Sequence, residues 1–229
     1  GIKMGAKGAS MTIHILNPNS LVHVTTGIAR AVAPIAAVSP VPIKCHTLTQ
    51  GPPGIETQAH VDGVVTPLLA QAKGLESDAS AFVIACFSDP GLAALREQSK
   101  VPVLGIAEAA VLTAMTMGQR FGIISILSKS IPRHMRYLGA MGVLDRLAAD
   151  LPLELGVQAL ANEARSFARL VEVGCALRDT RGAEVVILGC AGMTAFRARL
   201  ETELGIPVVE PCQAAAAMAV GRVALSRAQ

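Results

Sequence analysis

The sequence lacks tryptophan, and aromatic residues make up only 3% of its 229 residues. Modules that bind single-stranded nucleic acid stack bases on aromatic side chains, so this scarcity argues against that class. Charged residues are also few, at 16%, and no basic stripe is present. The formal net charge of +3 includes Lys3 and Lys7 and carries no information about partners. We therefore expect a small-molecule partner and no nucleic acid.

Several other features are missing. No apolar run approaches the roughly 18–20 uncharged residues that span a bilayer, and no signal peptide is visible, so we expect a cytoplasmic protein without a membrane partner. No C-x-x-C or H-x-x-x-H pair is present, which argues against a metal site. The five cysteines are an odd number and indicate thiols that are not paired in disulfides. Residues 1–10 resemble an expression-tag remnant ahead of Met11.

Hydrophobic residues make up 52% of the chain, enough for a sizeable core. Apolar runs alternate with longer amphipathic segments, which is typical of βαβ units and a parallel sheet. The predicted strands are 12–16, 42–47, 81–85, 101–104, 121–126, 153–157, 184–188 and 207–209. The predicted helices are 21–33 (ended by Pro34), 58–73, 91–98, 108–117, 132–141, 163–178, 194–204 and 213–225. The pattern predicts the α/β class.

Two apolar runs look like copies of each other, and each is followed by one cysteine. Phe82–Ser88 contains Cys86, and Val186–Gly192 contains Cys190, 104 positions further along the chain. Segments starting at Val101 and at Ile206 correspond with nearly the same offset. The chain therefore looks like a duplicated unit of about half its length. Because ligands bind at the carboxyl ends of parallel strands, we expect both cysteines at one cleft between two pseudo-symmetric lobes.

Two thiols on opposite sides of a substrate suit racemisation. One removes a proton from carbon next to a carbonyl, and the other returns a proton to the opposite face. An ordinary cysteine has a pKa near ~8.5, and we expect the helix after each cysteine to favour the thiolate. No Lys or Arg lies beside either cysteine in the sequence.

At four motifs the chain resembles the aspartate/glutamate/hydantoin racemase superfamily, and most closely its hydantoin and allantoin racemase branch. The motifs are Ile15–Ser20, Gly51–Glu56, Ile84–Gly91 and Ile187–Met193. The resemblance implies a racemase of small cyclic ureides without a metal or organic cofactor, with Cys86 and Cys190 as acid and base. Decarboxylases of the superfamily keep only the second cysteine, so Cys86 favours racemisation.

The resemblance also implies two α/β lobes with mainly parallel sheets flanked by helices and the active site between them. The last helix would return to the first lobe, so we expect residues 11–115 and 210–229 in one lobe and 116–209 in the other. We also expect a homo-oligomer.

Small polar groups at strand ends are candidates for binding substrate and stabilising its enolate. The predicted set is Asn17, Ser20, Glu56, Phe87, Ser88, Ser125, Ser128, Gly189 and Ala191. Because no cation is visible at these turns, a neutral hydantoin-type ring is favoured over aspartate or glutamate.

Alternatives stay open at this point. One is an amino-acid racemase or a maleate-type isomerase of the same superfamily, and another is a binding protein without activity. Asp89 is either a helix cap, which we favour, or an acid, and Glu56 either locks its loop or contacts substrate. We expect the remaining cysteines and the histidines to be structural or surface residues, among them Cys45, Cys175, Cys212, His14, His46, His60 and His134.

Overall fold

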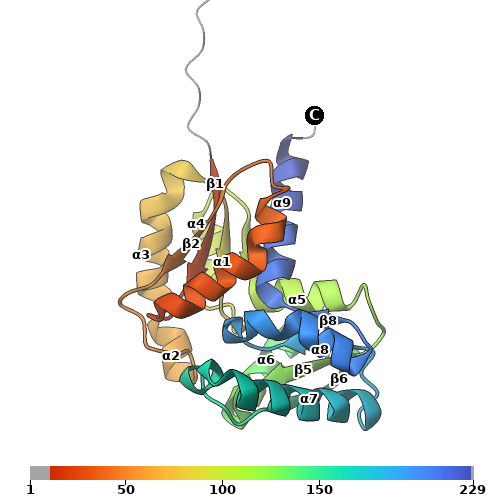
Figure 1. Ribbon diagram of the computed structural model, residues 1–229. Coiled ribbons are helices and arrows are strands. Elements are labelled where there is room, and N and C mark those ends of the chain that lie inside the picture. Colours follow the sequence, from red (N-terminus) through yellow and green to blue (C-terminus); the bar gives the residue numbers. More distant parts are fainter. Residues whose placement is uncertain (1–10, 228–229) are drawn as a thin grey trace, which may run out of the picture.

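The computed structural model describes residues 11–227, which form two four-stranded parallel sheets flanked by helices (Figure 1). The predicted α/β class with two pseudo-symmetric lobes is thus confirmed. The proposed tag, residues 1–10, lies outside the described residues. In the described part of the chain, no helix is long and apolar enough to cross a membrane.

The first sheet has the order β2-β1-β3-β4 and the second β6-β5-β7-β8, so each strand has a counterpart four strands later. The strands of the first sheet are β1 (Thr12–Asn17), β2 (Ile43–Thr47), β3 (Ala79–Ile84) and β4 (Val103–Gly105). Those of the second sheet are β5 (Phe121–Ser125), β6 (Leu147–Pro152), β7 (Val185–Leu188) and β8 (Val208–Val209). The shared order supports the duplication inferred from the two cysteine motifs.

Apolar side chains cover both faces of the first sheet. Along β3, Ala81 and Val83 join the main core, which continues into the second lobe, while Phe82 and Ile84 join a smaller core on the other face. The smaller core contains residues of α3 (Val65–Leu75) and α4 (Leu92–Gln98). A strand buried on both faces needs a nearly continuous apolar run, which explains the sequence pattern before each cysteine.

The main core contains α1 (Val22–Ala36), α5 (Ile106–Ala114) and α9 (Pro211–Arg227). Helix α9 follows β8 of the second sheet but packs against α1, α5, β3 and β4 (Figure 1). The chain therefore returns to the first sheet at its end. The exact lobe boundaries at positions 115 and 209 stay predictions.

The second sheet is flanked by α6 (Ile131–Met141), α7 (Glu163–Asp179) and α8 (Arg197–Leu204). Within residues 11–227, short 3-10 helices occupy five connections. They are η1 (Glu76–Asp78), η2 (Ser128–Ser130), η3 (Leu144–Arg146), η4 (Gln158–Ala161) and η5 (Ala191–Phe196).

Three predicted elements differ from the structure. Helix α1 continues past Pro34 to Ala36, and helical bonding resumes after it, because the Ala37 N–H donates to the Ala33 carbonyl at 3.0 Å. The predicted helix 58–73 is divided into α2 (Gln58–Gly63) and α3, because Pro67 has no N–H for the carbonyl of Gly63. The predicted strand 153–157 is wrong, since the strand there is β6, an edge strand whose Asp150 and Pro152 obscured the apolar pattern.

Candidate active site

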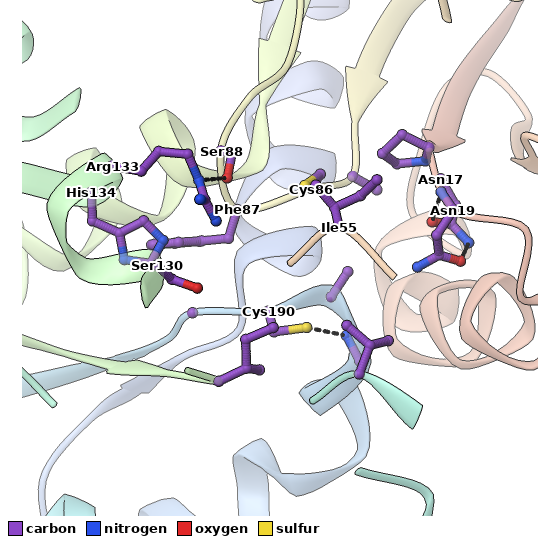
Figure 2. Close-up of a pocket in the computed structure, with 17 residues that line it drawn as sticks. Asn17, Asn19, Ile55, Cys86, Phe87, Ser88, Ser130, Arg133, His134 and Cys190 are labelled. Carbon is purple, nitrogen blue, oxygen red and sulfur yellow. Dashed lines mark hydrogen bonds between the residues drawn. The ribbon is translucent and has the colours of Figure 1, made fainter. Parts of the chain in front are cut away.

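A cavity lies between the carboxyl ends of the two sheets and has about 420 Å³ of empty space, part of it open to solvent (Figure 2). Asn17 is the last residue of β1. Cys86 lies two residues after the end of β3, and Cys190 lies two residues after the end of β7. The lining residues are Asn17, Pro18, Asn19, Ile55, Ala85, Cys86, Phe87, Ser88, Ile126, Ser130, Arg133, His134, Val157, Gly189, Cys190, Ala191 and Gly192.

The two cysteines face this cavity from opposite lobes (Figure 2). Neither forms a disulfide. The other cysteines lie outside the lining: Cys45 and Cys175 pack against the core, and Cys212 is buried at the start of α9. The structure thus brings together the two thiols that the repeated motif singled out.

Cys86 lies against a small apolar cluster that includes Ile55 and Val61. Burial raises the pKa of its thiol to about 12, and the nearby Cys190 and Asp89 add to this effect. Arg133 and the backbone N–H of Ser88 act in the opposite direction. The helix expected after Cys86 is α4, which begins at Leu92, so its first turn lies six residues beyond the thiol. At neutral pH this thiol is therefore protonated.

Cys190 has a more polar setting. It caps η5, and its Sγ accepts a hydrogen bond from the backbone N–H of Gly192 at 3.3 Å. Burial raises the pKa of this thiol to about 11; the Gly192 N–H lowers it, while Glu56 and Glu210 raise it. A backbone N–H thus favours the thiolate at both cysteines, and the one at Cys190 belongs to a helical turn.

The turn after β1 is held by its own side chains. The amide nitrogen of Asn17 donates to Asn19 Oδ1 at 2.9 Å and to Thr25 Oγ1 at 3.0 Å, and Asn17 Oδ1 accepts from the Asn19 backbone N–H at 3.1 Å. The amide nitrogen of Asn19 has no partner among the described residues, and Figure 2 shows it directed toward the cavity. Asn17 therefore positions Asn19, which offers two donors to a ligand.

Opposite this turn, α6 contributes Arg133 and His134 to the lining (Figure 2). Arg133 Nε donates to Ser88 Oγ at 2.9 Å. His134 is buried, and its Nδ1 lies 2.7 Å from Asp150 Oδ2 and 3.1 Å from Ser125 Oγ. The expectation of a surface position for His134 is wrong, because the carboxylate of Asp150 holds it in the wall.

Four predicted substrate-binding residues do not line the cavity: Ser20, Glu56, Ser125 and Ser128. Ser125 instead donates to Asp150 beneath His134. Ser128 is exposed, and its backbone N–H donates to Glu154. Ser125 and Ser128 lie at or just after the end of β5, but their hydrogen bonds are directed away from the cavity.

Glu56 locks its loop, which was one of its two predicted roles. Its Oε1 accepts the backbone N–H of Val157 at 2.9 Å, and its own N–H donates to the ring of His60 at 3.2 Å. Ile55 and Val157 both line the cavity, so this bond ties two cavity loops from different lobes.

Asp89 caps a helix, although not the one that follows it. Its carboxylate accepts the backbone N–H groups of Ala107 and Glu108, each at 2.9 Å, at the start of α5. Tyr137 donates its hydroxyl to the same carboxylate. Burial raises the pKa of Asp89 to about 6. Since Asp89 does not line the cavity, its alternative role as a catalytic acid has no support.

The predicted residues that line the cavity are Asn17, Cys86, Phe87, Ser88, Gly189, Cys190 and Ala191. The polar residues that the sequence reasoning missed are Asn19, Ser130, Arg133 and His134. Asn19 belongs to the Asn-Pro-Asn motif already noted, whereas nothing near Arg133 in the sequence pointed to Ser88. The described residues contain no group of three or more His, Cys, Asp or Glu side chains that would hold a metal.

Comparisons with known proteins agree with this geometry. Residues 13–219 match the family model described as Asp/Glu/Hydantoin racemase. A hydantoin racemase of Rhizobium meliloti is 35% identical over 212 residues, covering 91% of this chain and 87% of the relative. One of Paenarthrobacter aurescens is 35% identical over 219 residues, with 94% and 92% covered. The structure of an allantoin racemase from Klebsiella pneumoniae superposes with a TM-score of 0.87 at 31% identity, covering 95% of this chain and 89% of that one.

Proposed function

The chain is a racemase that belongs to the Asp/Glu/hydantoin racemase family, and we propose that it inverts the chiral carbon of a hydantoin- or allantoin-type cyclic ureide with Cys86 and Cys190 as its two bases. The observation that carries this proposal is the pair of thiols facing one cavity from opposite lobes. A planar ring between them would present one face to each sulfur.

The proposed chemistry needs one thiolate and one thiol. The thiolate takes the proton from the ring carbon next to the carbonyl, and the electron pair moves onto the carbonyl oxygen to give an enolate. The opposite thiol then donates its proton to the other face of that carbon, and the carbonyl reforms. Each turnover exchanges the protonation states of the two sulfurs, and no electrons leave or enter.

Ionising the first thiol is a substantial part of the barrier. With its pKa raised to about 11, forming the Cys190 thiolate at pH 7 costs on the order of 5 kcal/mol, and forming the Cys86 thiolate costs a similar amount. Each thiol serves as the base for one of the two enantiomers. A backbone N–H at each sulfur, that of Ser88 at Cys86 and that of Gly192 at Cys190, lowers this cost.

The enolate needs hydrogen-bond donors. The Asn19 amide nitrogen and the backbone N–H groups of Phe87 and Ala191 lie at the cavity and have no hydrogen-bond partner among the described residues. One such donor contributes roughly 3–4 kcal/mol to the stabilisation of an oxyanion transition state. These donors replace Ser20, Ser125 and Ser128, which the sequence reasoning had placed in this role.

The charges around the cavity favour a ring over a free amino acid. None of the described lining residues is acidic, so nothing there would pair with an α-ammonium group. A ureide ring has no such group. Arg133, however, supplies the cation that the sequence did not reveal, and it keeps an aspartate- or glutamate-type substrate as the second candidate.

The test uses one enantiomer of a substituted hydantoin, with loss of optical rotation and uptake of solvent deuterium at the chiral carbon as readouts. Cys86→Ser and Cys190→Ser should each lower racemisation at least 1,000-fold, because a serine hydroxyl is a far weaker acid and base. The matched control is Cys175→Ser on α7, outside the cavity, which should change the rate less than twofold. Near-wild-type activity in either active-site variant would overturn the two-base proposal.

L-Aspartate, L-glutamate and maleate form a second set of substrates in the same assay. Turnover of one of these together with no action on hydantoins would establish the second candidate. The proposed independence from cofactors predicts that extensive dialysis against a chelator leaves the rate unchanged.

A further inference from the structure

We propose that Ser130 and Arg133 form a carboxylate-binding subsite at one end of the cavity, so that the preferred substrates are hydantoins whose ring substituent ends in a carboxylate. The inference rests on the proposed function and extends it by naming the substituent. It follows from unpartnered donors, from the charge of the lining and from the space beyond it.

Arg133 is a partly buried cation without a counter-charge. Its only hydrogen bond to a described residue uses Nε, which donates to Ser88 Oγ at 2.9 Å. None of the ion pairs within the described part of the chain involves it. Burial lowers the pKa of this guanidinium. The two terminal nitrogens therefore offer four N–H donors and a positive charge at the cavity, a geometry that matches a carboxylate.

Ser130 supplies an independent observation. The residue is only 2% exposed, and its Oγ is buried without a hydrogen-bond partner. Figure 2 shows this hydroxyl directed toward the space between the two cysteines, at the same end as Arg133. A buried hydroxyl without a partner is costly, so it points to a ligand atom that completes it. An acceptor oxygen near Arg133 would satisfy both groups.

The neighbouring charges leave room for one anion. No acidic side chain lines the cavity among the described residues. Asp62 is close enough to affect Arg133, but it forms no ion pair with it and accepts a hydrogen bond from Gln58 at 2.9 Å. Arg136, one turn further along α6, adds a second positive charge and donates to Gln58 at 2.8 Å. The net field at this end of the cavity is therefore positive.

His134 lies beside the subsite and is held there by its own partner. Its Nδ1 lies 2.7 Å from Asp150 Oδ2. His134 forms the floor beside Phe87, with ring centroids 5.2 Å apart.

Beyond Arg133 the cavity has an outward continuation. A groove with about 570 Å³ of empty space shares Ser88, Arg133 and His134 with the cavity and is otherwise lined by Gln58, Val61, Arg136 and Tyr137. A substituent on the ring can extend in this direction while the ring stays between the sulfurs. The length of the ring substituent is thus less constrained than its charge.

The experiment compares two nearly isosteric substrates, a hydantoin with a 2-carboxyethyl group and one with a 2-carbamoylethyl group. For the wild-type protein we expect kcat/KM to be about 10–100 times higher for the carboxylate, the range given by a charge-assisted hydrogen bond. Allantoin, whose ureido group is neutral but also ends in an acceptor oxygen, should behave like the carboxamide.

Arg133→Met should reduce the carboxylate-to-carboxamide ratio to about one, and Arg133→Lys should keep part of it because the charge stays. Ser130→Ala should lower the ratio about 3–10-fold. The ratio is the decisive quantity, because Arg133 also favours the Cys86 thiolate and its loss slows both substrates. Arg165→Met on α7, which removes the same charge outside both the cavity and the groove, is the matched control and should change the ratio less than twofold.

Binding to the Cys86→Ser/Cys190→Ser double variant, measured by calorimetry, separates the two proposals. Racemisation of both hydantoins with no preference for the carboxylate, or an equal loss on both in Arg133→Met, would overturn the subsite alone. If neither hydantoin is racemised but the carboxylate binds more tightly and only with Arg133 present, the proposed function is wrong and the subsite stands. No turnover and no Arg133-dependent binding would overturn both.

Discussion

The rate of racemisation should rise with pH through the whole neutral range, because one buried thiol must ionise before it can remove a proton. The lower of the two raised values, the pKa of about 11 for Cys190, sets the scale. At pH 7 such a thiol is ionised in about one molecule in 10,000. Each pH unit therefore increases the reactive fraction, and with it kcat/KM, about tenfold up to roughly pH 10.

The assay follows optical rotation of one hydantoin enantiomer between pH 6 and pH 10, after subtraction of the buffer-catalysed rate. A substrate methylated at the imide nitrogen keeps the ring itself from ionising there. Glu56→Gln is an internal check. It removes a negative charge that raises the pKa of Cys190 but keeps an amide oxygen for the Val157 N–H. Its profile should keep the same slope and shift to lower pH.

A rate that levels off below about pH 8 would refute this reasoning. It would mean that a thiol ionises with a pKa at or below its ordinary value, so burial would not control its acidity. A profile unchanged in Glu56→Gln would contradict the electrostatic contribution of that carboxylate to Cys190.

Three further predictions concern stability. The pKa of Asp89 is raised from 3.8 to about 6, so the folded state binds the proton of this carboxyl more tightly than the unfolded state does. The free energy of unfolding should therefore fall by about 3 kcal/mol between pH 4 and 6. Urea titrations of Asp89→Asn should lack this decrease. Gly105→Ala would place a Cβ 2.2 Å from Asp89 Cγ, so it should lower the free energy of unfolding by about 3 kcal/mol and lower the melting temperature. Gly221→Ala in α9 is the control, because its Cβ would have no atom within 4 Å, and it should raise the melting temperature slightly. Glu56→Ala should lower the free energy of unfolding by about 1.5–3 kcal/mol, because the buried Val157 N–H loses its charged acceptor; Glu56→Gln should restore most of it in the same titration.

The sequence was sufficient to predict the α/β class and the duplicated arrangement. Both depend on local periodicity, because strands β3 and β7 are buried on both faces and give continuous apolar runs before Cys86 and Cys190. Errors arose where the pattern is weak, as at edge strand β6, or where a proline acts on a carbonyl four residues earlier, as at Pro67.

Half of the polar residues that line the cavity could not be predicted from their neighbours along the chain. Arg133 meets Ser88, 45 positions away in the sequence, and His134 is held by Asp150 on a strand that was itself misplaced. Asp89 caps a helix that begins 17 residues after it, at Ile106. Such contacts depend on how two lobes pack together, so neighbours along the chain do not reveal them. The inference of a neutral substrate from missing cations was weakened for the same reason.

The direction of proton exchange in single-cysteine variants tests the two-base mechanism most directly. Each enantiomer is incubated separately in deuterated water with Cys86→Ser or with Cys190→Ser, and deuterium at the chiral carbon is measured by mass spectrometry. Each variant keeps one thiol on one face of the ring, so we predict exchange without inversion, for one enantiomer in Cys86→Ser and for the opposite enantiomer in Cys190→Ser. Exchange of the same enantiomer in both variants, or continued inversion in either, would contradict the assignment of one thiol to each face.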